Sequence, residues 1–392
     1  MATNPNYKQV FKIQETDEST WGTAETDNFL KFAITGFDDG TESVITEDTQ
    51  INNDGMDTDI RKQTEAAMIT LDFDMRYCTC VDWLMQSALR NDDGWTDVSI
   101  SADDIAFSDA DNALSSTSTN FLSNDFTIGM VLLTSGASET ANAGLAKVTA
   151  VTAKKATLSW LTLSDEAEGE TISIKSSWIR NGNDIVSRTC EREFTGLTEF
   201  FAYNGMTVDQ FEINIESGAD VKGRAVLKGQ KRTGSGATVG TGAETAESSN
   251  PVFKSNLAVQ TFRIDNTAVT IGDRRFRLMI NNALIPNYEL GSVNPSSLTL
   301  NVFKASAEVQ VYLEDSTLFD AWEALTAQEI DIVLKGTDDN YYAITLFRAI
   351  AGAEPKIDAG SREGSSLVSV TLNGVKKASA PAYVCQFCKF AA

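Results

Sequence analysis

Residues 191–229 read EREFTGLTEFFAYNGMTVDQFEINIESGADVKGRAVLKG, and they indicate the fold class most clearly. Within this stretch, Phe211, Ile213 and Ile215 alternate with polar residues, which is the period of a strand with one buried face. Ser217-Gly218 then supplies a turn, and a second alternating segment follows. The stretch therefore predicts a pair of antiparallel strands.

The same alternation recurs along the chain, while helical periodicity is rare. Only Val81 to Leu89 and Leu318 to Leu325 have the pattern of helices, and both are short. We therefore predict an all-β protein with few short helices, built from β-sandwiches. Four further groups of residues alternate in this way: Ile69, Leu71, Phe73, Met75; Leu298, Leu300, Val302; Val309, Val311, Leu313; and Val368, Val370, Leu372.

Two internal similarities indicate a duplicated β domain. A shift of 240 residues lays the strand Ile69 to Phe73 on Val309 to Leu313, and a shift of 239 lays Trp83 on Trp322. A second similarity, at shifts of 86 to 87, sets Gly205 to Ile215 beside Gly291 to Val302. The alternative is coincidence between generic alternating strands.

The duplication and the local composition together predict four segments. Residues 1–100 and 177–235 form a first β domain, which is discontinuous, and residues 251–392 form a second. Residues 101–176 are rich in Asp, Ser and Thr and predict a small inserted β domain. Residues 236–250 lie in a Gly/Ser/Thr-rich stretch without aromatic residues and predict a flexible loop or linker.

Composition excludes several functions. The chain has 392 residues with 32 basic and 55 acidic side chains, a net charge of −23, so tight binding to nucleic acid is excluded because it needs a basic face. The chain has no histidine, which removes catalytic triads, Cys-His dyads and histidine zinc sites. No catalytic motif or cofactor-binding motif is present, so we predict a protein that is not an enzyme and binds no cofactor. Apolar runs are too short for a membrane helix, and the first thirty residues lack a secretory signal.

The five cysteines are odd in number, which argues against a closed set of disulfides. Cys78, Cys80, Cys385 and Cys388 are the candidate ligands of a four-thiolate zinc site. The first pair lacks the usual two-residue spacing, so we favour buried or idle thiols over a metal site.

Residues 191–229 resemble the most recognisable segment of the major tail tube proteins of long, non-contractile tailed bacteriophages. Near the N-terminus, residues 20–23 (TWGT) resemble the arm of that family, and residues 339–344 (DNYYAI) resemble its late strand. Residues 101–176 resemble the small β domain that many members carry. The residues that match the family's motifs are Trp21, Gly22, Thr23, Arg192, Glu193, Phe194, Gly205, Met206 and Gly223.

The resemblance implies a structural virion protein of the phage tail, synthesised in the host cytoplasm. Its partners would be further copies of itself, in rings that stack into a tube, and other tail proteins at the tube ends. Three duplicated chains per ring is the favoured arrangement, and six chains per ring stays open. Genome DNA would pass through without tight binding, and the net charge predicts an acidic lumen. No membrane is implied.

Two further hypotheses accompany this interpretation. Lys228, Lys231 and Arg232 lie at the root of the Gly/Ser/Thr-rich stretch and are candidates for ring stacking. The alternative function is a carbohydrate-directed β-sandwich on the virion or cell surface, either an adhesin or a glycosidase that uses carboxylates alone. That alternative needs clustered aromatic residues, and the six tryptophans are scattered along the chain.

Overall fold

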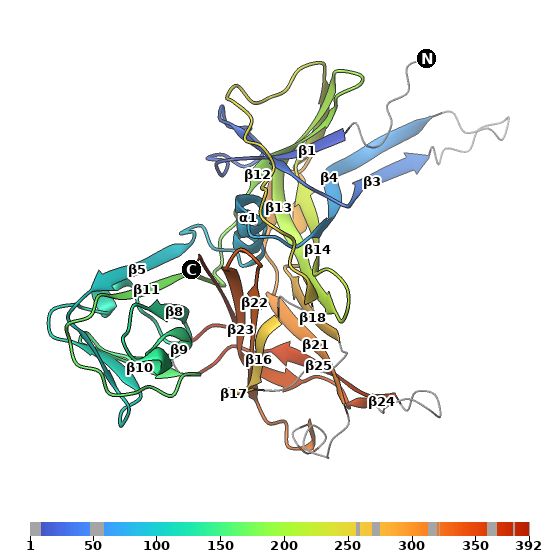
Figure 1. Cartoon of the computed structure of the whole chain (residues 1–392). Coiled ribbons are helices and arrows are strands. Elements are labelled where there is room, and N and C mark those ends of the chain that lie inside the picture. The colour runs from blue at the N-terminus through green and yellow to red at the C-terminus, as the bar shows by residue number, and fades with distance from the viewer. Residues whose placement is uncertain are drawn as a thin grey trace.

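The computed structural model describes residues 9–47, 59–255, 259–268, 275–312, 320, 322–358, 367–378 and 381–391. The predicted all-β fold is confirmed, because extended antiparallel strands dominate the described residues (Figure 1). The predicted helix at Val81 to Leu89 is present as α1, Thr79–Ala88. The predicted helix at Leu318 to Leu325 lies partly outside the described residues, and a helical turn is present at its end, where the amide of Leu325 donates to the carbonyl of Trp322.

The strands fall into two sequence-separated groups and an insertion. The first unit contains β1 Gln9–Gln14, β2 Phe29–Phe32, β3 Gly36–Glu47, β4 Ile60–Asp74, α1, β12 Arg188–Phe194, β13 Glu199–Glu216, β14 Lys222–Gly229 and β15 Lys231–Ser235. The second unit contains β16 Val259–Ile264, β17 Thr267–Ala268, β18 Arg275–Asn281, β21 Lys304–Tyr312, β22 Gln328–Lys335, β23 Asn340–Ala351, β24 Lys356–Asp358, β25 Leu367–Gly374 and β26 Cys385–Ala391. A separate hairpin, β19 Ile285–Asn287 with β20 Ser297–Thr299, joins β18 to β21.

The insert leaves the first unit after α1. Its strands are β5 Thr96–Ala102, β6 Ile105–Ser108, β7 Ala113–Ser116, β8 Val131–Ser135, β9 Gly144–Val151, β10 Lys155–Ser159 and β11 Ile172–Arg180, with short 3-10 turns at Leu122–Asn124 and Thr140–Asn142. It packs around a second hydrophobic cluster, to which β22, β23 and β26 of the second unit also contribute side chains. In Figure 1 the insert (teal to green) projects to one side of the two units.

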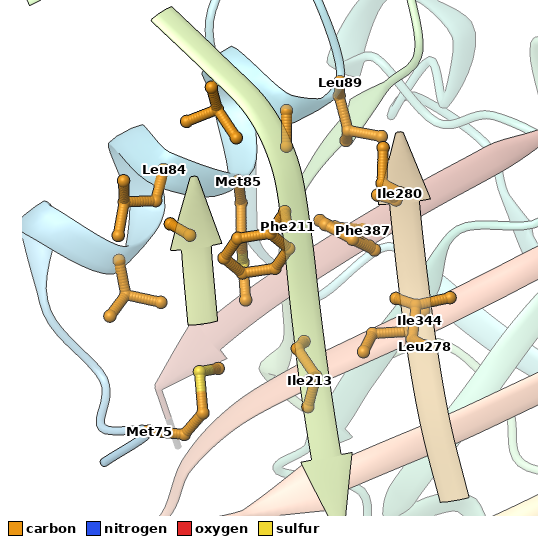
Figure 2. Close-up of a cluster of buried hydrophobic side chains, with 14 of the residues drawn as sticks. Met75, Leu84, Met85, Leu89, Phe211, Ile213, Leu278, Ile280, Ile344 and Phe387 are labelled. Atoms are coloured by element: carbon orange, nitrogen blue, oxygen red, sulfur yellow. The ribbon is translucent and has the colours of Figure 1, made fainter. Parts of the chain in front are cut away.

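One antiparallel sheet runs through both units. Its strand order is β3, β4, β14, β13, β18, β21, β25 and β24, and we call it the shared sheet. One face of it packs on α1 and on the inner strands of both units, as Figure 2 shows around Phe211, Ile213, Leu278 and Ile280. The hydrophobic core is therefore continuous from the first unit into the second.

Candidate assembly surfaces

The same seven strand pairings occur in both units. In the first unit β1 pairs with β2 and β12, β13 pairs with β12, β14 and β15, and β4 pairs with β3 and β14. In the second unit β16 pairs with β17 and β22, β23 pairs with β22, β25 and β26, and β21 pairs with β18 and β25. Each pairing in the first unit has one counterpart in the second. Strand β25 pairs with the end of β23 and then, further along, with β24. The two units therefore repeat one topology.

This repeat accounts for one of the two internal similarities and corrects the other. The shift of 240 residues relates β4 to β21, which occupy the same place in their units, but it is two residues too long, because the strand pairings set Met68 level with Ser306, a shift of 238. The shift of 86 to 87 residues is wrong, because β13 corresponds to β23, whereas residues 291–302 contain only the short β20. Val302, predicted to be a strand residue, lies outside the strands and is 65% exposed.

The registers of the paired strands fix which positions of the two units correspond. Gly229 and Gly374 end equivalent strands, since the next amides, of Gln230 and Val375, each donate to a backbone carbonyl at 2.8 Å. In the first unit Lys228 lies opposite Met68, which lies opposite Gly40. In the second unit the same path runs from Asn373 to Ser306 and then to Met279. Gly40 of β3 therefore corresponds to Met279 of β18.

An aromatic pair supports this correspondence. Three positions before Gly40 and Met279 lie Phe37 and Phe276, which correspond to each other. Phe37 packs on Phe11 with ring centroids 5.6 Å apart, and Phe276 packs on Phe262 at 5.9 Å. Phe11 and Phe262 lie in the equivalent strands β1 and β16.

The two units join through β13 and β18, and this junction is fully paired over seven residues on each strand. Phe211, Ile213 and Ile215 of β13 and three residues of β18 are buried on the core side. On the other face, the guanidinium of Arg277 binds both carboxylate oxygens of Glu212, at 2.7 Å each. Bidentate pairs of this kind fix geometry as well as adding energy. The junction thus has buried apolar side chains on one face and an ion pair of fixed geometry on the other.

The shared sheet ends in two edges without a strand partner among the described residues, β3 and β24. Val368 lies six residues before Gly374, as Gly223 lies six residues before Gly229, so Val368 and Gly223 correspond. Ile357 lies opposite Val368 and Ile213 lies opposite Gly223, so these two isoleucines also correspond. Ile213 is fully buried by the junction, whereas Ile357 is 52% exposed. Beside the β3 edge, a pocket is lined in part by Phe11, Ile34 and Phe37. Unpaired edges with apolar side chains are templates for another strand.

Several family-motif residues form one cluster around the carboxylate of Glu18. This carboxylate accepts hydrogen bonds from the amides of Gly22 and Gly205, both at 2.8 Å, and from two hydroxyl groups. The indole of Trp21 donates to the carbonyl of Gly205 at 2.9 Å. Gly205 has φ +73°, and a Cβ atom there would lie 2.8 Å from the Trp21 ring. The sequence singled out the tryptophan and the glycines but missed Glu18, which joins them.

The other motif residues have packing roles. Arg192 lies over the rings of Phe37 and Phe194, at 4.3 and 4.7 Å. Glu193 pairs with Lys12 at 2.5 Å, and Met206 is buried. A Cβ atom on Gly223 would lie 2.2 Å from the Phe73 ring, so this position needs glycine. Thr23 is exposed, and its amide donates to the carbonyl of Thr20.

The stretch predicted to contain the linker makes contacts within the chain. Lys231 and Arg232 lie in β15, and Arg232 pairs with Asp39 at 3.0 Å. Lys228 pairs with Asp209 at 3.3 Å. Residues 236–250, which we call the strap, cross the sheet of β1, β2 and β12. A role of Lys228, Lys231 and Arg232 in ring stacking stays a prediction.

The strap covers a buried acid of the first unit. Glu191 is fully buried, pairs with Lys12 at 3.3 Å, and accepts hydrogen bonds from Thr238 and Val239 of the strap. Asp331 occupies the equivalent place in the second unit, opposite Arg263 as Glu191 lies opposite Lys12. There the insert, rather than a strap, supplies the cover.

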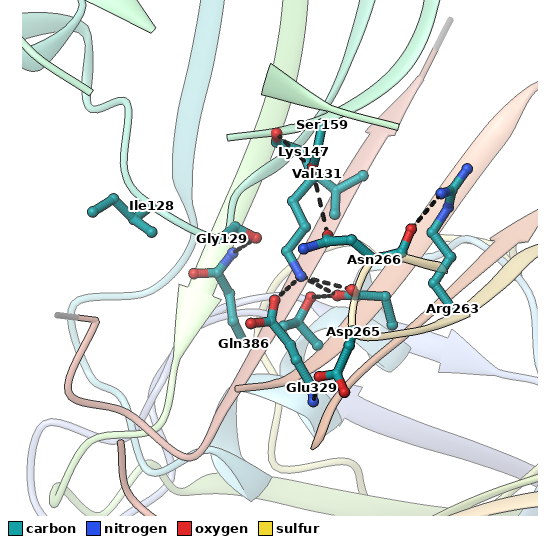
Figure 3. Close-up of polar contacts among 12 residues, drawn as sticks. Ile128, Gly129, Val131, Lys147, Ser159, Arg263, Asp265, Asn266, Glu329 and Gln386 are labelled. Carbon is teal, nitrogen blue, oxygen red and sulfur yellow. Dashed lines mark hydrogen bonds and ion pairs between the residues drawn. The ribbon is translucent and has the colours of Figure 1, made fainter. Parts of the chain in front are cut away.

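The insert docks on the second unit through a buried ion pair. Lys147 of β9 binds both oxygens of Asp331 at 2.6 Å. Lys147 also pairs with Glu329 (Figure 3). Burial alone would lower the pKa of Lys147, but these two carboxylates raise it above its ordinary value. Trp160 adds a ring contact to Arg263, at 5.2 Å. The insert therefore starts from the first unit and binds the second.

The zinc candidates are not assembled into a metal site. Among the described residues, no group of three or more potential metal ligands is present. All five cysteines are free; Cys78 is half-buried and the other four are buried. Burial raises the pKa of Cys78 to about 11, and burial also raises the pKa of Cys385 and Cys388.

The aromatic residues that a carbohydrate site would need are held at separate places. Trp83 is buried in the core, and Trp21 belongs to the Glu18 cluster. Trp95 and Trp178 donate to backbone carbonyls of Asp82 and Asp125. Trp160 lies at the joint between the insert and the second unit. Among the described residues, these five tryptophans do not form the stacked platform that the alternative function requires.

A family model described as phage tail tube protein matches residues 12–374, which is nearly the whole chain and includes both units and the insert. The resemblance found in the sequence is thereby confirmed. No curated protein matches the chain. Within the described part of the chain, no helix has the length and apolar character needed to cross a membrane.

Proposed function

Since the chain belongs to the phage tail tube protein family, we propose that it polymerises into rings of three chains, which stack into a tube that conducts genome DNA. The family is structural rather than catalytic, and it places the chain in the virion tail. Ring formation, the number of chains and the conduit role are our proposals. Other tail proteins at the two tube ends are the expected further partners.

The repeated topology is the observation that carries this proposal. The first and second units are tandem tube domains joined by β13 and β18, and this junction is a template for joining one chain to the next. A contact of this head-to-tail kind closes into a ring when its rotation divides a full circle. Three chains would supply six equivalent units per ring, so the ring would have approximate sixfold symmetry.

In such a ring, the polar face of the shared sheet would line the duct. Acidic and basic side chains alternate on it and pair across strands. The ion pairs on this face join Lys222 to Asp74, Arg224 to Asp72, Arg275 to Glu216, and Arg277 to Glu212 and Glu308. The lining is therefore charge-balanced rather than acidic, which differs from the expectation drawn from the net charge. Cations already paired with carboxylates are poor ligands for phosphate, so DNA could still pass without tight binding.

Negative-stain microscopy of the purified protein tests the proposal. We expect rings or tubes whose averaged views have threefold symmetry that approximates sixfold symmetry, with three lateral projections from the inserts. A true sixfold ring with six projections would contradict the three-chain arrangement. Discrete monomers at high protein concentration would contradict ring formation itself.

A further inference from the structure

The two free edges of the shared sheet carry charges opposite to those at the internal junction. Ile357 corresponds to Ile213, so its neighbour Lys356 corresponds to Glu212. Gly40 corresponds to Met279, so Asp38, two residues earlier, corresponds to Arg277. The acid of the junction becomes a base at the β24 edge, and the base of the junction becomes an acid at the β3 edge.

Both free-edge side chains are available for a partner. Lys356 and Asp38 are exposed, and neither forms an ion pair within the described part of the chain. At the junction, by contrast, Glu212 and Arg277 are only partly exposed and bind each other through two contacts of 2.7 Å. The equivalent positions thus differ in the sign of their charges and in whether a neighbouring unit is present to pair with them.

We propose that, where two chains meet, Lys356 of one chain forms an ion pair with Asp38 of the next. The register follows from the junction, where Glu212 lies directly opposite Met279. Transferred to the free edges, Lys356 lies opposite Gly40 of the neighbouring chain, and Asp38 lies two residues along the same face. This inference rests on the proposed ring and specifies the contact that closes it.

The exchange of signs also selects the correct partner edge. If β3 of another chain took the place of β18 beside β13, Glu212 would face Asp38. If β24 of another chain took the place of β13 beside β18, Lys356 would face Arg277. Like charges across neighbouring strands are destabilising, so each edge disfavours the wrong partner. The charges therefore favour rings in which first and second units alternate.

Charge reversal tests the ion pair. The variants Lys356→Glu and Asp38→Lys should each raise the protein concentration needed for half-maximal ring assembly by about two- to fivefold, the range expected for the loss of an exposed pair. The double variant should return it to within about twofold of the unmodified protein. Sedimentation velocity measures the ring fraction. Lys222→Glu with Asp74→Lys is the matched control, because that pair lies within one chain, and its reversal should leave the ring threshold unchanged.

Cysteine cross-linking tests the register independently of assembly strength. A Cβ atom on Gly40 would meet only Met68, at 3.6 Å or more, so Gly40→Cys fits without strain. Combined with Lys356→Cys, it should give covalent trimers on a non-reducing gel, because directly opposed residues come within disulfide range. Lys356→Cys combined with Asp38→Cys or with Glu42→Cys shifts the pairing by two residues and should cross-link more slowly.

The outcomes separate the two levels of the proposal. If the unmodified protein forms rings while the effects of the two charge reversals simply add, the ion pair is wrong and the ring stands. If a shifted cysteine pair cross-links faster, the register is wrong. If the unmodified protein forms no ring at any concentration, the proposed function and this inference both fail.

Discussion

Ile213 and Ile357 occupy equivalent positions in the two units, yet the first is fully buried and the second is 52% exposed. The difference arises because β18 lies beside Ile213, while no described strand lies beside Ile357. Substitution of Ile213 therefore tests the stability of the chain, whereas substitution of Ile357 tests its assembly into rings.

Substitution at these two positions should have different effects. Ile213→Ala removes buried methyl groups and leaves a cavity, so the free energy of unfolding should fall by about 2–5 kcal/mol. Ile357→Ala should change the unfolding of the isolated chain by less than about 0.5 kcal/mol, as at other exposed sites, but should weaken ring assembly. Urea denaturation and sedimentation velocity measure the two quantities. Equal effects of both substitutions on unfolding would contradict the assignment of β24 as a free edge.

A second prediction concerns the Glu18 cluster. Gly205 and Gly218 both have positive φ, +73° and +76°, but only Gly205 is crowded, since nothing lies within 4 Å of a Cβ atom placed on Gly218. Gly218→Ala should cost about 1 kcal/mol, from backbone strain alone. Gly205→Ala should cost at least twice as much, because the Trp21 ring must also move. Thermal unfolding of the two variants provides the comparison. Equal shifts in Tm would contradict the prediction that the Trp21 ring clashes with a side chain at position 205.

The buried pair of Lys147 and Asp331 gives a third prediction. Lys147→Met leaves a buried carboxylate without its cation and should cost about 3–5 kcal/mol, whereas adding Asp331→Leu should recover most of that loss. Hydrogen exchange in β9 and β22 reports on docking of the insert. The same reasoning applies to replacement of residues 101–176 by a Gly-Ser linker, which we expect to preserve ring formation when Asp331→Leu is included. If the Lys147→Met variant docks normally, the ion pair does not hold the insert in place.

Acid should destabilise the insert through Asp104. This carboxylate accepts hydrogen bonds from the hydroxyl groups of Ser116 and Ser118 and from the backbone and side chain of Thr119, which hold its pKa well below the usual range. Because the folded pKa lies below the unfolded value of about 3.9, the stabilisation is complete above that value and is lost as pH falls through the folded pKa. Trp160 fluorescence should therefore follow an acid transition that Asp104→Asn weakens. An identical transition in the variant would assign it to other carboxylates.

The local patterns of the sequence predicted much of this fold, because the inner strands of the shared sheet, such as β13, β14 and β18, have one buried face and therefore alternate. Phe211 to Ile215 is the plainest case. The full repeat is harder to detect in the sequence. For example, the equivalent strands β1 and β16 share only a three-residue similarity, Phe11-Lys12-Ile13 with Phe262-Arg263-Ile264. Ladder positions, rather than sequence, identify those two segments as equivalent strands.

The docking of the insert could not be predicted, because it depends on contacts between distant segments. Lys147 and Asp331 are 184 positions apart, and neither lies in a pattern that marks a buried charge. Glu18 was missed for a similar reason, since one acid among 55 has no local signature. Its role is visible only when the amides of Gly22 and Gly205 converge on it.

The insert, which leaves the first unit and binds the second, has a mechanical consequence. Within a chain, the boundary between the two units is held by the pairing of β13 with β18. It is also held by the insert, which starts from the first unit and binds the second. A boundary between two chains would have the strand pairing and the proposed ion pair of Lys356 with Asp38, without an insert that joins its two sides. Under the load of tail bending or DNA ejection, a ring built in this way would yield first at three of its six boundaries, so fragments of a sheared tube should be whole chains.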